Sequence, residues 1–141
     1  MNSLRYFVDT SFLVARFHED DDRHADAIAF LDEVMASPGA QPRLILHDYV
    51  FDEMVTTLRS HSRSHRVAVA AGETIWRSRT AEILPVNRPT MEAAWKLFVD
   101  RPDRLWSFTD CVSFVIMGQQ SLREALSFDE NFKQAGFITR P

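Results

Sequence analysis

Five short runs of apolar residues are spaced along the chain, and helix-like patterns fill most of the intervals between them. The runs cover residues 4–8, 43–47, 82–86, 124–128 and 137–139, and they have the length of strands. Between the runs, apolar residues recur every three or four positions, as they do from Ala25 to Val34. This spacing predicts helices over 10–17, 22–35, 48–58, 66–79, 107–119 and 130–134, and one that starts near Pro89.

Single residues predict where several helices begin. Asp22 and Asp48 are suited to cap the helices that follow them, because a carboxylate accepts hydrogen bonds from free N–H groups. Ser107 and Asp110 have the Ser-x-x-Asp spacing of a capping box. Pro85 cannot donate a ladder hydrogen bond, so its strand is expected at an edge of the sheet.

The alternation of strands with helices favours parallel pairing and right-handed crossovers. The sequence therefore predicts an α/β fold, a three-layer α/β/α sandwich around a central, mostly parallel sheet of four to five strands. A chain of 141 residues is long enough to bury one core, so residues 1–141 are expected to form a single domain.

The composition is ordinary for a globular protein, with 45% hydrophobic and 26% charged residues. No apolar run approaches the roughly 20 residues that span a bilayer, so no membrane association is expected. Because Cys111 is the single cysteine, an internal disulfide is excluded and a reducing, cytoplasmic setting is expected. The net charge of −4 excludes a chain coated with basic residues for nucleic acid, although five arginines lie between positions 59 and 79.

Four acidic residues lie at the ends of apolar stretches: Asp9, Glu53, Asp110 and Asp129. A carboxylate beside a buried strand is costly unless its charge is compensated, and several that converge call for a cation. In open parallel sheets ligands gather at the carboxyl ends of the strands, where these acids are expected. Taken singly, Asp9, Asp110 and Asp129 can each be a helix cap and Glu53 an ordinary helix acid, so only their conjunction favours catalysis.

Oxygen ligands without His or Cys at ligand spacing favour a hard cation, Mg²⁺ or Mn²⁺. Such a site activates water and offsets the charge of a phosphodiester under attack. A phospho-receiver also gathers acids around Mg²⁺, but it wants paired acids after the first strand, and here Thr10 and Ser11 follow Asp9.

At this point the residues resemble a known family. The segments Phe7–Leu13, Trp106–Cys111 and Leu126–Phe132, with the helical Glu53 between them, look like those of PIN-domain ribonucleases of the VapC type, the toxins of bacterial toxin–antitoxin pairs. The resemblance covers nearly the whole chain in the right order. A PIN-like fold that only binds a partner is the alternative, and the four intact acids argue against it.

The resemblance implies a Mg²⁺- or Mn²⁺-dependent endoribonuclease whose catalytic residues are Asp9, Glu53, Asp110 and Asp129. Asp9 and Asp110 would bind the metal directly, and Glu53 and Asp129 through water or a second ion. Ser11 and Thr109 would steady the acids by hydrogen bonds. Glu130, adjacent to Asp129, leaves open which of the two completes the site. The family further implies an RNA substrate, with tRNA as the leading expectation, a homodimer and a small antitoxin protein.

The arginines Arg59, Arg63 and Arg66 follow Glu53 and are suited to a phosphate-binding face beside it, with a solvated helix face as the alternative. His61 and His65 lack further zinc ligands and are expected to be surface histidines, with RNA phosphate contact as their functional interpretation. The tryptophans Trp76, Trp95 and Trp106 are expected to pack in the core or at an interface rather than to stack on bases. Cys111 is expected to be a packing residue.

Overall fold

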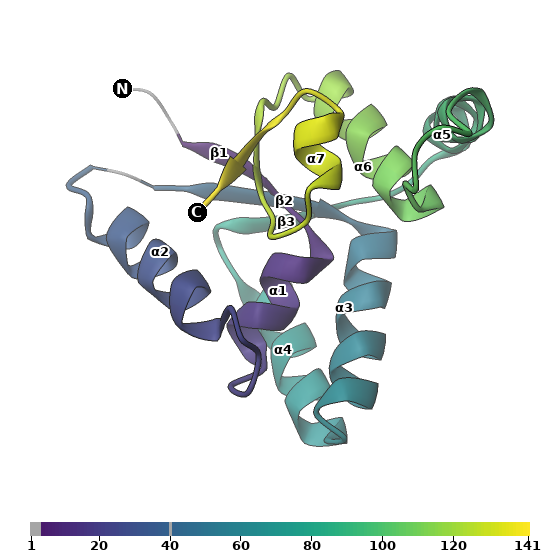
Figure 1. Cartoon of the computed structure of the whole chain (residues 1–141). Helices are drawn as coiled ribbons and strands as arrows, with labels where there is room; N and C mark the ends of the chain where they lie inside the picture. Colours follow the sequence, from purple (N-terminus) through teal and green to yellow (C-terminus); the bar gives the residue numbers. More distant parts are fainter. Residues whose placement is uncertain (1–3, 40) are drawn as a thin grey trace.

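Five parallel strands lie between two layers of helices in the computed structural model, which describes residues 4–39 and 41–141 (Figure 1). The elements in chain order are β1 (Arg5–Val8), α1 (Thr10–Phe17), α2 (His24–Ala36), β2 (Arg43–His47), α3 (Asp48–His61), α4 (His65–Arg77), β3 (Ala81–Leu84), α5 (Arg88–Asp100), α6 (Phe108–Gln119), β4 (Glu124–Leu126), α7 (Asn131–Gln134) and β5 (Ile138–Arg140). Residues 1–3 and 40 of the expected 1–141 domain lie outside the described residues.

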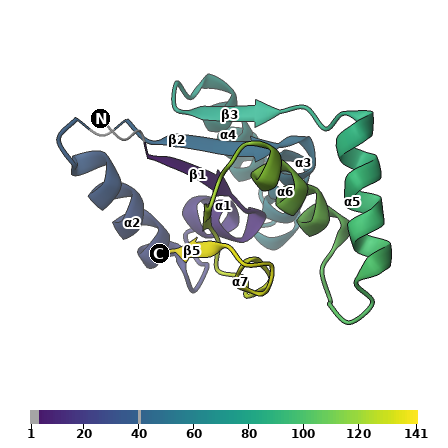
Figure 2. The ribbon, with the colours of Figure 1, turned by 90° about the horizontal axis from the view of Figure 1, so that it is seen from above.

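The strand order β3-β2-β1-β4-β5 creates a reversal in the winding of the chain between β1 and β4. The chain first moves outward from β1 to β3, then turns through α5 at one end of the molecule and returns through α6 to β4 (Figure 2). All four strand pairings are parallel, so the predicted three-layer α/β/α sandwich is confirmed. The carboxyl ends of β1 and β4 therefore flank the crevice where such sheets bind ligands.

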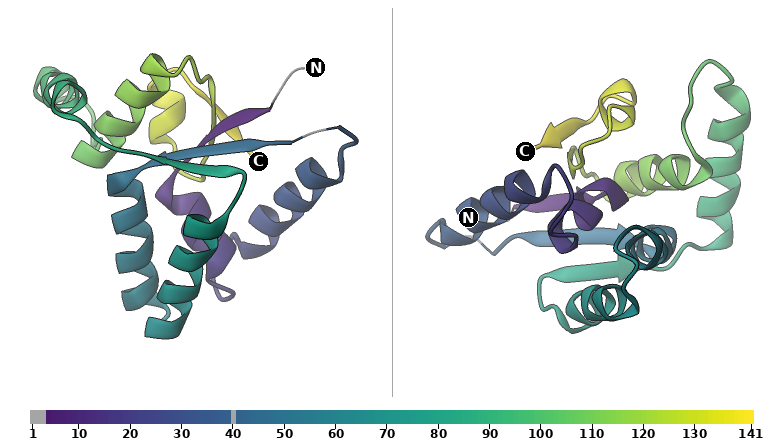
Figure 3. Two further views of the ribbon diagram at one scale, coloured as in Figure 1. Left: turned by 180° about the vertical axis from the view of Figure 1, so that it is seen from behind. Right: turned by 60° about the horizontal axis from the view of Figure 1, so that its bottom comes forward.

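The two helical layers cover opposite faces of this sheet. Helices α1 to α4 lie on one face and α6 and α7 on the other (Figure 1). Helix α5 stands at one end of the molecule, away from the sheet, as both views in Figure 3 show. Phe7 in β1 is fully buried and stacks on Phe132 of α7 at 5.9 Å between ring centroids. This contact joins the sheet to the layer formed by α6 and α7. No helix in the described residues is long and apolar enough to cross a membrane.

Local capping explains most helix starts. The capping box of Ser107 and Asp110 is present as predicted, and Ser64 and Asn87 cap α4 and α5 through their side-chain oxygens. Strand β3 is an edge strand, as Pro85 indicated, although it ends at Leu84.

Two predicted caps are wrong. Helix α2 begins at His24, and Asp22 lies exposed in the preceding turn, where Asp21 rather than Asp22 accepts a bond from Arg23 N. The cap of α3 is His47, and Asp48 instead accepts a hydrogen bond from the backbone N–H of Val86 at 3.0 Å. Asp48 is therefore used to join the start of α3 to the segment after β3.

The buried His47 links three elements near the carboxyl edge of the sheet. Its Nδ1 accepts a hydrogen bond from Tyr49 N at 3.2 Å, so its Nε2 carries the proton and donates to Ser113 Oγ at 2.9 Å. Ser113 in turn donates to the carbonyl of Thr109 at 3.0 Å. Burial lowers the pKa of His47 to about 4, and this effect outweighs the charge of Asp48, which raises the pKa. The ring is therefore neutral, which is the form that completes this chain of bonds.

We predict that His47→Asn lessens the acid sensitivity of folding. The unfolded imidazole binds a proton below a pH of about 6.5, but the folded one stays neutral down to a pKa of about 4. Wild-type stability therefore contains a contribution, at most about 3 kcal/mol, that is lost as the pH falls through this window. Asparagine keeps a capping oxygen but cannot titrate, so it removes this contribution.

The check is urea unfolding at pH 7 and pH 5. The exposed His65→Asn serves as the control and should retain the wild-type difference between the two pH values. If His47→Asn loses as much stability between pH 7 and pH 5 as wild type does, the buried neutral imidazole is not the cause of the acid sensitivity of folding.

Candidate active site

A groove of about 520 Å³ lies at the carboxyl edge of the sheet, beside the reversal point between β1 and β4. All four acids predicted from the sequence line it: Asp9, Glu53, Asp110 and Asp129. They come from the residue after β1, the second turn of α3, the first turn of α6 and the loop after β4. The parallel fold thus brings together side chains that are up to 120 positions apart in the sequence.

Asp9 is the most enclosed of these acids, with 6% of its surface exposed. In the described part of the chain, its hydrogen bonds all end on Oδ2, which accepts from Ser11 Oγ at 2.7 Å, Ser127 Oγ at 2.9 Å and Ser11 N at 3.4 Å. Burial raises the pKa of Asp9 to about 6, against the lowering effect of the two hydroxyl groups and with a further rise from Asp110 and Asp129. One carboxylate oxygen is therefore fixed by neutral donors, and Oδ1 has no donor among the described residues.

Asp110 lies in the capping box of α6 and is 9% exposed. Its Oδ2 accepts from Ser107 N at 3.0 Å and from Asn131 Nδ2 at 2.9 Å. Burial raises its pKa, although both donors lower it, and the charge of Asp129 raises it further. Capping and an active-site position are combined in this residue, as the sequence had allowed.

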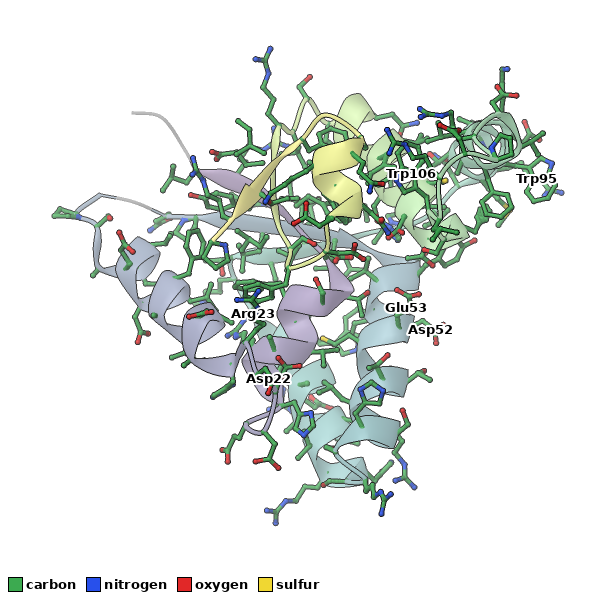
Figure 4. The ribbon with its side chains drawn as sticks, viewed as in Figure 1. Asp22, Arg23, Asp52, Glu53, Trp95 and Trp106 are labelled. Carbon is green, nitrogen blue, oxygen red and sulfur yellow. The ribbon has the colours of Figure 1, made fainter. Side chains whose placement is uncertain are left out.

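Glu53 faces the groove from α3, while its neighbour Asp52 is exposed and bonded to Thr56 (Figure 4). Its Oε1 accepts from Thr10 Oγ1 at 2.9 Å. Burial raises the pKa of Glu53, and the hydroxyl groups of Thr10 and Thr109 act in the opposite direction. Of the two hydroxyl residues expected to steady the acids, Thr109 therefore lies close enough to Glu53 to lower its pKa.

Asp129, and not Glu130, faces the groove with the other acids. The amide of Asn131 bridges it to Asp110, since Nδ2 lies 3.4 Å from Asp129 Oδ2 and 2.9 Å from Asp110 Oδ2. Asp129 also accepts a bond from Asn131 N at the start of α7. Glu130 points elsewhere and pairs with Lys133 at 3.6 Å. The geometry therefore favours Asp129 as the fourth acid.

Two supporting residues were missed by the sequence reasoning, Ser127 and Asn131. Ser127 Oγ donates to Asp9 and accepts from Asp129 N at 3.0 Å, which joins the first acid to the last. The predicted supporting role of Ser11 agrees with its bond to Asp9, and its Oγ also accepts from Phe128 N at 3.0 Å. Both missed residues lie two residues from Asp129, but their bonds to Asp9 and Asp110 depend on the fold and have no local signal in the sequence.

The predicted basic face lies apart from this groove. Arg59 and His65 line a separate hollow with the exposed Trp76. Arg63 is exposed in the turn between α3 and α4, and Arg66 is exposed in the first turn of α4. The basic side chains that line the acidic groove are instead Arg23 and His61.

The predictions that the tryptophans and Cys111 are packing residues are confirmed only in part. Trp106 is buried and Trp95 is exposed (Figure 4). With 65% and 57% of their surface exposed, Trp76 and Trp95 do not pack in the core, and packing at an interface stays a prediction for them. Cys111 is fully buried, and burial raises the pKa of its thiol to about 11, which agrees with a packing role.

The donor set suits a cation that keeps part of its water. Within residues 4–39 and 41–141, no three His, Cys, Asp or Glu side chains already form a metal-binding cluster. Magnesium, however, usually takes one or two carboxylates directly and retains several waters. Asp9 and Asp110 fit this need, because neutral N–H and O–H donors orient Oδ2 of each and leave negative charge facing the groove.

We predict that Asp9→Asn stabilises the protein when divalent cations are absent. The pKa of Asp9 is raised to about 6 in the folded protein, so between pH about 4 and 6 the folded carboxyl keeps a proton that the unfolded one has lost. The free energy of unfolding therefore falls as the pH rises through this range. Removing the charge should add about 1–3 kcal/mol to the free energy of unfolding at pH 7.5 in EDTA. Adding Mg²⁺ should then raise the melting temperature of wild type but not that of Asp9→Asn.

The exposed Asp32→Asn on α2 is the matched control and should behave like wild type with and without Mg²⁺. A loss of stability in Asp9→Asn in EDTA would show that the buried charge is not a net cost.

Comparison with known proteins agrees with this geometry. The family described as PIN domain matches residues 6–138. The 23S rRNA-specific endonuclease VapC20 of Mycobacterium tuberculosis is 34% identical over 132 residues, which are 94% of this chain and 95% of that protein. The crystal structure of that protein, described as a sarcin–ricin loop cleaving toxin, has a TM-score of 0.85 at 33% identity and covers 96% of this chain and 99% of its own.

More distant structures share the fold. VapBC2 of Rickettsia felis, bound to a promoter DNA fragment, has a TM-score of 0.69 at 11% identity and covers 97% of this chain and 98% of its own. FitAcB of Neisseria gonorrhoeae has a TM-score of 0.67 at 14% identity and covers 96% of each chain. On the match over residues 6–138 and the identity to VapC20, this chain belongs to the PIN-domain family and to its VapC type.

Proposed function

We propose that this protein is a metal-dependent endoribonuclease, the toxin of a type II toxin–antitoxin pair, and that it cleaves 23S rRNA in the sarcin–ricin loop. The observation that carries the proposal is the groove lined by four acids, in a chain 34% identical over 94% of its length to a 23S rRNA-specific endonuclease. The expectation of a tRNA substrate stays untested, but the substrate of this relative favours rRNA.

The four acids are proposed to share the work unequally. Asp9 and Asp110, the two most buried, would hold Mg²⁺ or Mn²⁺ directly, with Glu53 and Asp129 acting through water or a second ion. The bound ion would supply an activated water and offset the charge of the scissile phosphate. Ser11, Ser127 and Asn131 keep the acids oriented through the hydrogen bonds described above.

Family membership also supports the expected partners. The structure of VapC20, at 33% identity, is described as that of a toxin, so a small antitoxin is proposed here as well. A homodimer, a cytoplasmic location and a single domain over residues 1–141 remain proposals of the same kind. Membership of the PIN family excludes the phospho-receiver alternative.

We predict that Glu53→Gln abolishes cleavage while Asp52→Asn does not. The two residues are neighbours on α3, but only Glu53 lines the groove (Figure 4). The experiment incubates purified ribosomes with each protein and Mg²⁺ or Mn²⁺, and primer extension maps breaks in 23S rRNA. Wild type and Asp52→Asn should give one break in the sarcin–ricin loop, and Glu53→Gln should lower its rate by at least about 100-fold.

Total tRNA and an EDTA sample run in parallel. Cleavage in EDTA would contradict the metal mechanism, and cleavage of tRNA but not of rRNA would replace the proposed substrate. Intact RNA in every wild-type sample would favour a PIN fold that only binds its partner.

A further inference from the structure

The groove carries an excess of negative charge for a protein that binds RNA. Five acids line it, the four candidate catalytic residues and Asp21. Among the described residues of its lining, one side chain is permanently cationic, Arg23. A bound metal can offset the charge at the scissile phosphate, but neighbouring phosphates need another cation, because like charges otherwise repel the strand.

Arg23 is held in place on the wall of the groove by a ring and a carboxylate. Its guanidinium lies 5.4 Å from the centroid of the Phe128 ring, and Phe128 itself stacks on the buried Phe12 at 5.8 Å. Its Nη1 lies 3.4 Å from Asp26 Oδ2, and both side chains are more than half exposed. The guanidinium is thus oriented by the protein and accessible to a ligand.

A second hollow, of about 430 Å³, adjoins the groove at this position. Arg23, Phe128 and Asp129 line both hollows, so Arg23 stands on the boundary between them. The lining of the second hollow includes Phe30, which offers an aromatic face, and Lys133, which pairs with Glu130 at 3.6 Å. The acids Asp26, Glu33 and Asp129 also line it, so Arg23 is the cation nearest to the groove. An RNA strand that leaves the acidic groove in this direction therefore passes Arg23. Arg23 and Glu53 both line the groove, and Figure 4 shows them on opposite sides of α1.

We propose that Arg23 binds the RNA phosphate next to the scissile one and directs the attached nucleotide into this second hollow. The inference rests on the proposed ribonuclease function and names how its substrate is held. A guanidinium matches phosphate geometry with two parallel hydrogen bonds, and its flat face remains supported by the Phe128 ring. Asp26 forms an ion pair with Arg23 in the free protein, and the RNA phosphate replaces Asp26 as the partner of the guanidinium.

The test measures RNA binding in an Asp110→Asn background, where the RNA should stay intact. A fluorescently labelled stem–loop with the sarcin–ricin sequence is titrated with protein, and anisotropy gives the Kd at several salt concentrations. Adding Arg23→Ala should weaken binding about tenfold, the size of one charge-assisted hydrogen bond. It should also lower the slope of log K against log salt by about 0.7–0.9, as expected for one lost phosphate contact.

Three further variants make the result specific. Arg77→Ala is the matched control, because Arg77 also pairs with an acid of its own helix, at 3.1 Å, but lies in the last turn of α4 away from the groove. It should leave the Kd unchanged. Asp26→Asn releases Arg23 and should tighten binding about two- to fivefold, and Arg23→Lys should retain part of the affinity and the full salt slope.

The outcomes separate this inference from the proposed function. Suppose that the Asp110→Asn protein binds the stem–loop and the wild-type protein cleaves ribosomes. If Arg23→Ala then has the same Kd as Arg77→Ala, Arg23 has no part in RNA binding. Weakening by Arg23→Ala without a change in the salt slope would also overturn the phosphate contact, since a structural effect would leave that slope unaltered. If the Asp110→Asn protein does not bind the stem–loop and the wild-type protein does not cleave ribosomes, the proposed function fails and this inference fails with it.

Discussion

The burial of several carboxylates at one edge of the sheet is the constraint to which the rest of this structure responds. Burial raises the pKa of Asp9, Glu53 and Asp110, so each is held as an anion against a solvation cost. Among the residues that the structure describes, the side-chain donors to these acids are serines, Thr10 and Asn131, and none is an arginine or a lysine. Because these donors orient the acids without neutralising them, the groove keeps the charge that attracts a cation.

The scaffold behind the groove is rigid where that charge has to be placed accurately. Asp9 follows β1 and Ser127 follows β4, and pairing of these neighbouring strands fixes their bond across the reversal point. On the other side, the neutral His47 joins the start of α3 to α6 through Ser113 and the carbonyl of Thr109. Glu53 and Asp110 extend from these two helices, so their separation depends on a hydrogen-bonded core rather than on mobile loops.

Local signals in the sequence were enough for the strands, most helix starts and the four acids. The capping box at Ser107 and the short apolar run before Asp9 depend on neighbouring residues, which a single sequence displays. Asn131, Ser127 and Arg23 were missed because their importance comes from side chains brought beside them by the fold. Trp95 was expected in the core or at an interface, and it is not in the core, because α5 stands at the end of the molecule and leaves Trp95 exposed (Figure 3).

The central claim is that these acids form a cation site, and anomalous scattering from crystals grown with Mn²⁺ tests it most directly. If the acids bind a cation, a peak should lie in the groove within about 2.5 Å of a carboxylate oxygen of Asp9 or Asp110, with water completing the coordination. The peak should disappear in Asp9→Asn crystals prepared in the same way. A groove without a peak at millimolar Mn²⁺, or a peak that persists unchanged in Asp9→Asn, would contradict the account.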